Sequence, residues 1–437
     1  MSILEEIDDK NVWQDFLAYK EKSRLSKREG AFLRDFIETE RYKSVTGNLK
    51  EGYYLSIPEK RLLNKHGKSK KRVVYTFSET ENTVLKLISY LLYRYDDAQP
   101  YNCYSFRRNY GAKKAIAAIT KTPNIENKYS CKLDIKDYFN SIDVELLLPI
   151  LEKLLTGDTP LYSFFEKLLT ADKAVYNGET ITEKRGAMAG MPVSQFFANV
   201  YLAGMDRFFL EQGILYARYS DDIIFFADNK DLLEKYLDAA KGFLAAYHLE
   251  VNPEKIRITE PGERWEYLGI SFDNGTIRLS QATLKKIKGK IRRKARSIYR
   301  WKIRKNADDK KAMRVFARAV NRKFFGKGAE DEFTWARWFF PLVTDDRDLK
   351  AIDAHIQEYM RFVSSGRFNK ANYRIRYGYL KQCGYISLVN RYHSILCSLK
   401  KISSTVRNNI TSTGPRINPL KPKTNIPPSM AKKIIKG

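Results

Sequence analysis

The sequence is poor in the residue types that build metal-binding fingers, disulfide frameworks and membrane spans. Its 437 residues contain only four cysteines and four histidines, which are too scattered for a zinc-ligand spacing or a disulfide framework. No apolar run approaches the roughly 18 residues that a membrane-spanning helix needs. The start, MSILEEIDD, is acidic and lacks the basic and apolar regions of a secretory signal. We therefore expect a cytoplasmic protein with no membrane partner.

Acidic residues are also scarce, and the scarcity is concentrated in one segment. The chain has 79 Lys+Arg against 51 Asp+Glu, a net charge of +28. Residues 281–327 hold 19 Lys/Arg but only two acids, Asp308 and Asp309. Apolar residues recur there at helical spacing, which predicts an amphipathic helix with a basic face. Phosphate contact is the favoured interpretation of this face, and a solvated surface helix is the alternative. The expected nucleic-acid contacts are Lys285, Lys286, Lys290, Arg292, Arg293, Arg296 and Arg300.

Two further segments are rich in positive charge. Residues 366–392 interleave Arg and Lys with tyrosines, which suits either a nucleic-acid groove or the edge of a helical core, and the sequence leaves both open. Residues 404–437 hold seven Lys/Arg, five Pro and no acids, which predicts a flexible basic tail. A chain this basic and aromatic is expected to hold a polyanion, and the alternative is a merely soluble basic protein.

Two adjacent aspartates lie between apolar runs in residues 216–227, YARYSDDIIFFA. The pattern predicts a β-hairpin with Asp221 and Asp222 at its tip. Adjacent like charges repel, and a divalent cation would compensate them. An ordinary Asp-rich turn is the alternative interpretation.

A third carboxylate lies 87 residues earlier. Residues 130–135 alternate polar and apolar side chains, as in a strand with one buried face, and Asp134 falls near the strand end. If this strand pairs beside the hairpin, three carboxylates converge. Such hard oxygen ligands suit Mg²⁺. Two ions about 4 Å apart would activate a 3′-hydroxyl and stabilise a pyrophosphate leaving group.

These segments resemble reverse transcriptases of the prokaryotic lineage that includes group II intron, retron and defence-associated enzymes. The family's [FY]xDD box corresponds to Tyr219–Asp222, and its first catalytic aspartate to Asp134. The resemblance implies that Asp134, Asp221 and Asp222 are catalytic and that, with Ile135, they form the site for two Mg²⁺ ions, with Mn²⁺ as a substitute. Phe139 matches the aromatic residue that selects dNTPs by excluding a 2′-hydroxyl. A core phenylalanine is the alternative for that position.

Further family boxes follow in the expected order over residues 70–270. By resemblance, Lys71 and Arg72 in KKRVV grip the triphosphate, and Arg107 in YSFRR contacts phosphate or template. The stretch 190–202, GMPVSQFFANVYL, is similar to the nucleotide-binding box and leads into one helix that buries Phe197, Val200, Tyr201, Met205 and Phe208. The implied nucleotide contacts in the last boxes are Gly190, Ser194, Gln195 and Lys255, where the lysine protonates pyrophosphate, and the primer grip in WEYLGI is Tyr267, Leu268 and Gly269.

The sequence departs from the common P-Q-G-x-x-x-S-P form of the nucleotide box. Met188 and Ala189 replace its Pro and Gln, and Gln195 replaces its second Pro. The family's glutamine contacts the nucleotide, so the change bears on fidelity, nucleotide preference and template dependence. The S-Q version also resembles enzymes of diversity-generating retroelements, which copy with errors at adenines. The retron V-T-G thumb signature is absent, and no Cys/His-rich endonuclease module is visible. These features favour a stand-alone, defence-associated enzyme.

The resemblance implies an α+β right-hand polymerase with fingers, palm and thumb, an antiparallel palm sheet, and a helical basic thumb and C-terminal region. The expected divisions are an N-terminal helical extension (1–60), fingers and palm (61–277), thumb (278–330), C-terminal helical region (331–403) and tail (404–437). The expected function is synthesis of cDNA from dNTPs on a dedicated non-coding RNA template in anti-phage defence. The alternatives are an enzyme of a diversity-generating retroelement, a template-independent or protein-primed DNA polymerase, and a maturase-like RNA-binding protein. The oligomeric state stays open.

Overall fold

The computed structural model describes residues 1–397 except for 24, 53–54, 65–70 and 327–333. The chain divides into two compact units, Met1–Leu388 and Val389–Gly437. No helix within the described ranges is long and apolar enough to cross a membrane. The predicted basic tail, 404–437, lies outside the described residues.

The N-terminal region is helical. Two of its helices begin at serine capping boxes, in which Ser2 pairs with Glu5 and Ser26 pairs with Glu29, and such boxes satisfy the free N–H groups of a first turn. The indole of Trp13 stacks on Tyr42 with ring centroids 4.8 Å apart, inside the core. The four helices are α1 (Ile3–Glu6), α2 (Lys10–Ser23), α3 (Lys27–Glu38) and α4 (Lys43–Lys50).

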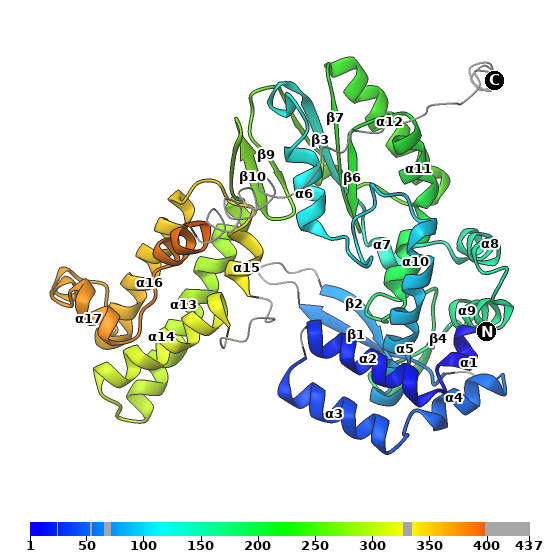
Figure 1. Cartoon of the computed structure of the whole chain (residues 1–437), viewed down its shortest axis with the longest axis horizontal. Coiled ribbons are helices and arrows are strands. Elements are labelled where there is room, and N and C mark those ends of the chain that lie inside the picture. The colour runs from blue at the N-terminus through cyan, green and yellow to red at the C-terminus, as the bar shows by residue number, and fades with distance from the viewer. Residues whose placement is uncertain (24, 53–54, 65–70, 327–333, 398–437) are drawn as a thin grey trace, which may run out of the picture. The chain divides into compact units, whose positions relative to one another are not determined.

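The fingers sheet has the strand order β2-β1-β4-β5 (Figure 1). Its first two strands form an antiparallel hairpin, and β1 pairs with β4 in parallel. The strands are β1 (Glu59–Asn64), β2 (Lys71–Thr76), β4 (Lys173–Tyr176) and β5 (Glu179–Thr182). The intervening helices are α5 (Glu79–Leu91), η1 (Leu92–Ala98), α6 (Ala112–Thr120), η2 (Ile125–Asn127), α7 (Tyr138–Ser141), α8 (Val144–Leu154) and α9 (Thr159–Thr170).

The palm sheet is antiparallel throughout, with the order β6-β7-β3-β8. Helix α12 packs against β3 and β7, and the apolar side chains between them belong to the main core. The strands are β3 (Tyr129–Asp134), β6 (Tyr216–Tyr219), β7 (Asp222–Ala227) and β8 (Arg257–Thr259), and the helices are α10 (Ser194–Tyr201), α11 (Ala203–Glu211), α12 (Lys230–Ala246) and η3 (Pro253–Lys255). This mixture of helices with an antiparallel palm sheet confirms the predicted fold class.

One prediction about the palm helices is wrong in detail. A single helix was expected to follow residue 190 and to run through Phe208. Instead, α10 ends at Tyr201 and α11 begins at Ala203, because the backbone at Leu202 leaves the helical range, with φ −103° and ψ 12°. The expected apolar face is otherwise buried, since Phe197, Val200, Tyr201 and Met205 all lie in the core.

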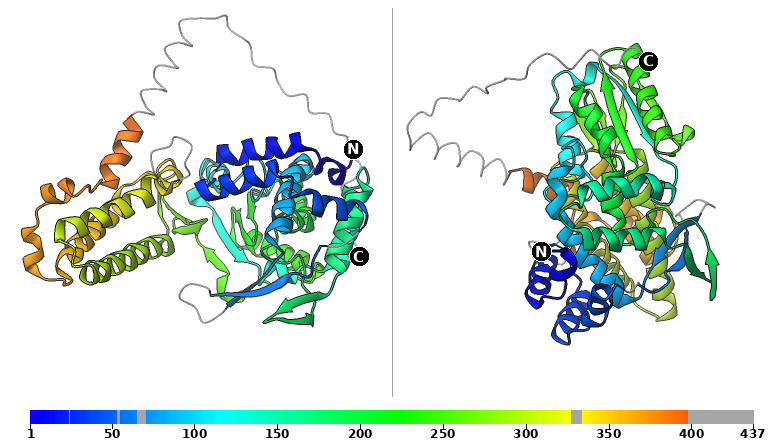
Figure 2. Two further views of the ribbon diagram at one scale, coloured as in Figure 1. Left: turned by 90° about the horizontal axis from the view of Figure 1, so that it is seen from below. Right: turned by 90° about the vertical axis from the view of Figure 1, so that its right-hand side faces the viewer.

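The C-terminal region begins with a small antiparallel sheet and continues as helices (Figure 2). Helices α13, α14 and α16 pack on one another. The predicted amphipathic helix is α13, and it buries Ile287, Ile291, Ala295 and Ile298, whereas Ile303 near its end is 62% exposed. The elements are β9 (Trp265–Tyr267), β10 (Ile270–Asp273), β11 (Thr276–Leu279), α13 (Gln281–Arg304), α14 (Asp309–Phe325), α15 (Trp335–Phe339), α16 (Arg347–Ser365), η4 (Lys370–Arg374) and α17 (Tyr377–Gln382).

Candidate active site

The palm ladder brings the three predicted carboxylates to one end of the sheet. Strands β3 and β7 pair with Asp134 directly opposite Asp222. Asp221 lies in the turn between β6 and β7, where Ser220 has a left-handed backbone, φ 61°. The N–H of Ile135 donates to the carbonyl of Asp221 at 3.1 Å and continues the ladder into the turn. The predicted hairpin, strand and juxtaposition are therefore all present.

The charges at this sheet end repel one another. Burial raises the pKa of the Asp221 carboxyl, and the neighbouring carboxylates of Asp222 and Asp134 raise it further. Two lysines supply compensating charge, since Lys255 Nζ pairs with Asp134 and Lys132 Nζ lies 3.2 Å from Asp222. The three carboxylates are therefore stable together only when nearby positive charge offsets their repulsion.

The donor set fits Mg²⁺ by its chemistry, because its side-chain ligands are hard carboxylate oxygens that share a surplus of negative charge. In the described part of the chain, no three or more His, Cys, Asp or Glu side chains are already gathered around one point as a finished metal site. The residues that would hold the ion are Asp134, Asp221 and Asp222.

A buried ion pair supports the β6–β7 hairpin, and it was not among the predictions from the sequence. Arg218 on β6 and Asp206 on α11 are both fully buried, and their side chains form a two-point contact through Nε and Nη2. The hydroxyl of Tyr216 also donates to Asp206, at 2.8 Å, and Arg218 Nη2 donates to the carbonyl of Asn199 at 3.1 Å. A buried pair of this kind needs all its hydrogen bonds to offset desolvation. Its only signal in the sequence is a charged residue inside each of two apolar stretches.

The turn that carries Asp221 is held by a second polar contact. The N–H of Ser220 donates to Ser105 Oγ at 2.9 Å, and that hydroxyl donates to Asn199 Oδ1 at 2.9 Å. Asn199 Nδ2 returns a bond to the carbonyl of Ser105 at 2.7 Å. The YSFRR and GMPVSQFFANVYL boxes therefore meet beneath the catalytic turn.

Arg107 lies in the same box but faces the protein. Its side chain donates to the carbonyls of Pro100, Cys103 and Asp96, it is 8% exposed, and it stacks on Tyr110 at 4.0 Å. These contacts indicate a structural role. They do not favour the predicted contact with phosphate or template, which stays a prediction.

Phe139 lies on α7, which begins shortly after β3 ends at Asp134. Its ring is half-buried and lies 6.3 Å from that of Phe106, which in turn lies 6.2 Å from that of Tyr219. The three rings form a row that ends next to Asp221 and Asp222. Phe139 is thus held by neighbours and is still accessible on one side, as a residue that contacts a sugar must be.

The predicted triphosphate residues lie on separate elements. Lys71 and Arg72 are exposed on β2, and Lys255 lies at the end of η3 against Asp134. Gln195 is exposed near the start of α10, whereas Ser194 is buried and its hydroxyl donates to the carbonyl of Met188 at 2.7 Å.

Gly190 was expected to let the backbone approach the nucleotide. In the structure its close neighbour is β2: at φ 105°, a Cβ on Gly190 would lie 3.0 Å from the carbonyl oxygen of Tyr75 and 3.1 Å from Val74 Cβ. The glycine therefore serves the packing of its loop against the fingers strand.

The predicted primer grip is the β9–β10 turn. Tyr267 is buried, and its hydroxyl lies 3.2 Å from the carbonyl of Ala217 and 3.3 Å from that of Asp222. Leu268 and Gly269 form the two-residue turn with φ 46° and 87° and are partly exposed. Tyr267 thus attaches this turn to the catalytic hairpin, and the other two residues form its accessible part.

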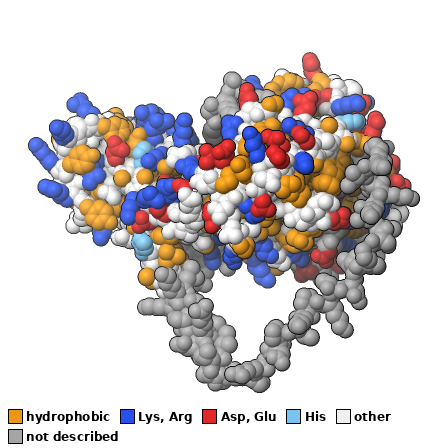
Figure 3. Space-filling model, turned by 90° about the horizontal axis from the view of Figure 1, so that it is seen from above, with side chains coloured by type: hydrophobic (Ala, Val, Ile, Leu, Met, Phe, Trp, Pro, Cys, Tyr) orange, Lys and Arg blue, Asp and Glu red, His pale blue; other side chains and the backbone are white. Residues whose placement is uncertain are grey.

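The cations predicted to bind nucleic acid lie on the accessible side of α13. All seven are exposed except Lys290, which is half-exposed. Figure 3 shows Lys and Arg side chains gathered over the helical region on the left. The tyrosines of residues 366–388 fit both interpretations of that segment. Tyr373 is 65% exposed, as in a nucleic-acid groove, whereas Tyr385 is 5% exposed, as at the edge of a helical core.

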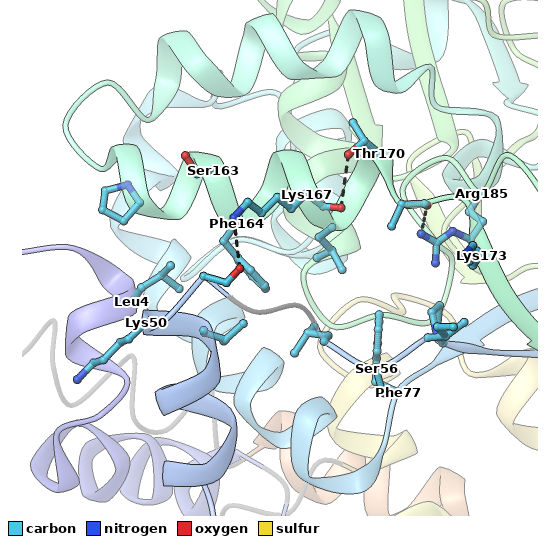
Figure 4. Close-up of a pocket in the computed structure, with 18 of the residues that line it drawn as sticks. Leu4, Lys50, Ser56, Phe77, Ser163, Phe164, Lys167, Thr170, Lys173 and Arg185 are labelled. Atoms are coloured by element: carbon cyan, nitrogen blue, oxygen red, sulfur yellow. Dashed lines mark hydrogen bonds between the residues drawn. The ribbon is translucent and has the colours of Figure 1, made fainter.

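A cavity of about 1110 Å³ lies elsewhere, among α1, α4, α9 and the chain leading into β1 (Figure 4). Its lining is mostly apolar, with Lys50, Lys167, Lys173 and Arg185 around it. The three carboxylates do not line it. The cavity and the candidate active site are therefore distinct.

Comparison with known proteins decides which family shares this arrangement. Residues 63–272 match the family described as "Reverse transcriptase (RNA-dependent DNA polymerase)". The chain carries a reverse transcriptase domain. This domain contains all three carboxylates, the hairpin, the fingers strand and Phe139, and it confirms the resemblance to prokaryotic reverse transcriptases.

Two relatives of the reverse transcriptase domain are retron enzymes. The chain is 27% identical over 185 residues to "Retron Mx65 reverse transcriptase" of Myxococcus xanthus, covering 40% of this chain and 43% of that protein. It is 28% identical over 158 residues to "Retron Ec83 reverse transcriptase" of Escherichia coli, covering 33% and 48%. The chain thus spans less than half the length of each of these relatives.

Among solved structures, the chain is similar to apo telomerase of Candida tropicalis, with a TM-score of 0.43 and 13% identity over 81% of each chain. A form of that telomerase truncated from its C-terminal domain gives a TM-score of 0.42 and 14% identity, covering 52% of this chain and 55% of that one.

Proposed function

We propose that this protein is an RNA-directed DNA polymerase that uses Mg²⁺ to make cDNA from dNTPs on an RNA template. The observation that carries the proposal is the pairing of Asp134 opposite Asp222, with Asp221 in the adjoining turn. Three carboxylates at one end of a rigid sheet are what nucleotidyl transfer requires, because the reaction depends on positioning and charge stabilisation more than on a protein nucleophile.

Each carboxylate has its own place in this proposal. Asp134 and Asp221 hold the metal ions, Asp222 supports them, and Ile135 completes the site through its place beside Asp221 in the ladder. When bound, Mg²⁺ lowers the pKa of the attacking hydroxyl and stabilises the leaving group's charge; Mn²⁺ is a substitute. The surrounding cations hold the triphosphate from two elements, with Lys71 and Arg72 on β2 and Lys255 at the end of η3.

Lys255 is the best placed of these cations. Its ammonium group already reaches Asp134, and its side chain is 45% exposed, so it is free to turn toward a bound triphosphate. We infer that it donates a proton to the departing pyrophosphate. Of the other predicted nucleotide contacts, Gly190, Ser194 and Gln195, the last offers an exposed polar side chain, whereas Ser194 is buried.

The proposed partner is an RNA, held by the thumb. The cations of α13 and the exposed tyrosines that follow offer phosphate contacts and stacking surfaces on neighbouring elements. Arg361 lies 5.2 Å from the Tyr373 ring and Lys381 lies 4.9 Å from the Tyr377 ring, so charge and aromatic surface occur together. A dedicated non-coding template RNA, a role in anti-phage defence and a cytoplasmic location are part of the same proposal.

A second candidate is a polymerase that needs no template, or one of the error-prone type found in diversity-generating retroelements. It is favoured by Ala189 at the position where the resemblance expects a glutamine that contacts the nucleotide. A maturase-like RNA-binding protein is a weaker candidate, because it has no use for three carboxylates in register.

One experiment separates these candidates. The protein is purified, its bound RNA is sequenced, and incorporation of dNTPs and rNTPs is measured with and without that RNA. The controls are the double variant Asp221→Ala/Asp222→Ala and the single variant Asp228→Ala, whose side chain is 77% exposed just beyond β7. We expect RNA-dependent incorporation of dNTPs in the wild type and Asp228→Ala, and none in the double variant.

Other results would redirect the proposal. A homopolymer made without RNA would indicate the template-independent candidate. RNA binding with no synthesis would indicate the maturase-like one. Synthesis retained in the double variant would exclude the carboxylate mechanism.

A further inference from the structure

The loop that precedes α10 is bonded to the backbone of the candidate gate residue. The N–H of Ala187 donates to the carbonyl of Phe139 at 2.8 Å. Gly186 makes this contact possible: its φ is 53°, and a Cβ there would lie 2.6 Å from the carbonyl oxygen of Asn140 and 2.8 Å from that of Phe139. Any other side chain would push loop and gate apart.

The same loop is bonded on its other side to the fingers. The N–H of Tyr75, on β2, donates to the carbonyl of Ala189 at 2.8 Å, and Gly190 packs against the backbone of that strand. The loop therefore fills the space between α7, which carries Phe139, and β2, which carries Lys71 and Arg72. The width of this loop therefore determines the distance between the Phe139 ring and β2.

One side chain connects all three elements. Asn140 Oδ1 accepts a hydrogen bond from the N–H of Ala189 at 3.0 Å, and its Nδ2 lies 3.4 Å from the carbonyl of Val73 on β2. The same Nδ2 lies 3.4 Å from a carboxylate oxygen of Asp137. Only the amide oxygen can accept from a backbone N–H, so these contacts orient the amide in one way.

The loop is also fixed at points that do not involve Asn140. Arg185, which Figure 4 shows at the edge of the cavity, donates from Nη2 to the carbonyl of Ala171. The hydroxyl of Ser194, at the start of α10, holds the carbonyl of Met188, whose side chain is fully buried. Because these bonds do not depend on Asn140, its loss would loosen the contact at Ala189 without releasing the whole loop.

We propose that Asn140 is a positioning residue that fixes the distance between the Phe139 ring and the triphosphate-binding strand β2, and thereby sets the selection of dNTPs over rNTPs. The proposal rests on the polymerase function proposed above. In this chain Ala189 has only a methyl side chain, with no polar group for a nucleotide, and its backbone N–H and carbonyl are both engaged. Selection therefore depends on how precisely the loop holds the gate, since small displacements of a reacting geometry have large kinetic effects.

The test compares four variants with the wild type in single-nucleotide incorporation, using dNTPs and the matching rNTPs on the same primed RNA template. Asn140→Ala removes both contacts, and we expect it to raise KM for dNTPs and to lower the ratio of kcat/KM for dNTP over rNTP by roughly three- to tenfold, as the loss of one or two hydrogen bonds implies. Asn140→Asp keeps the acceptor for Ala189 but replaces the donor near Val73 and Asp137 with a carboxylate oxygen, so it should lose the β2 contact and also lower the ratio.

Ser141→Ala is the matched control, because it removes a hydrogen bond from the same short helix to Lys136 without touching the loop or β2. It should leave the ratio of kcat/KM values unchanged. In Asn140→Ala, Asn140→Asp and Ser141→Ala alike, kcat at saturating dNTP should equal that of the wild type. A Phe139→Ala variant shows the range of the assay, since it removes the gate itself.

The outcomes separate this inference from the proposed function. If the wild type incorporates neither nucleotide, the polymerase proposal is wrong. If the wild type is active and Asn140→Ala keeps the wild-type ratio and KM, the positioning role is overturned. An equal loss in Asn140→Ala and Ser141→Ala would also overturn it, because the effect would then come from α7 stability alone.

Discussion

The catalytic hairpin and helix α13 both depend on charge, but they present it in opposite ways. At the hairpin, three carboxylates are held by strand register and a fully buried Arg218–Asp206 pair. On α13, the seven cations project from one face and share no fixed register with a partner strand. Catalysis requires each carboxylate at a defined position, whereas binding of a nucleic-acid backbone requires only sufficient positive charge on one surface. Substitutions should therefore act singly and strongly in the first region, and cumulatively in the second.

The largest expected effect is at the hairpin. Replacing Asp134 with Ala should reduce dNTP incorporation at least about 10²–10³-fold, the scale seen when one preorganised charge contact is removed from an active site. RNA affinity should stay within about twofold of wild type if, as proposed, the phosphate contacts that dominate nucleic-acid affinity come from the cations of α13. Primer extension and filter binding measure the two quantities. A parallel fall in RNA affinity would mean that the two regions are not separate.

The next effect tests what supports the hairpin. Asp206→Ala leaves Arg218 buried without its carboxylate partner, which should lower the free energy of unfolding by about 3–5 kcal/mol. Urea unfolding measures the change. Asp238→Ala is the control, because Asp238 is 76% exposed and pairs with Lys241 on the surface; it should change stability by less than about 0.5 kcal/mol. Similar losses in both variants would contradict the role of the buried pair.

A smaller and graded effect is expected on the thumb. The triple variant Lys285→Ala/Lys286→Ala/Arg293→Ala should reduce the salt dependence of RNA binding, lowering the slope of log K against log salt concentration by about two to three. The rate of incorporation at saturating RNA should not change. The control is Lys230→Ala/Lys235→Ala/Lys241→Ala on α12, where three exposed lysines of the palm are removed. If both triple variants change the slope equally, α13 is not a preferred site of RNA binding.

The smallest effect concerns the pH dependence of the hairpin itself. The pKa of Asp221 is raised in the folded protein by burial and by its two carboxylate neighbours. The folded state therefore binds this proton more tightly than the unfolded state, so without metal the protein should gain stability as the pH falls through the raised pKa toward the ordinary value of an aspartate. Asp221→Asn should raise Tm at pH 7 and remove this gain. Thermal unfolding in EDTA measures both, and a variant less stable than wild type would show that the carboxylate is not strained.

Local patterns in the sequence predicted much of this site. The apolar runs around Asp221 and Asp222 indicated the hairpin, alternation indicated β3, and helical spacing indicated α13. The break at Leu202 between α10 and α11 left no such mark, because the apolar spacing continues across it. The contacts that hold the site were also missed: Arg218 with Asp206, Ser105 with Asn199, and Asn140 with Ala189. Each joins residues 12 to 94 positions apart, and periodicity within one segment carries no information on such pairs.

The ladder between β3 and β7 also determines which changes of chain length the protein tolerates. Because side chains alternate along a strand, removing one residue between Tyr129 and Asp134 would turn Leu133 outward and carry Asp134 to the wrong side of the sheet. No substitution elsewhere restores that arrangement. Libraries made from this chain should therefore vary length only in the connections between elements, and a one-residue deletion within β3 should abolish activity as fully as replacement of Asp134 itself.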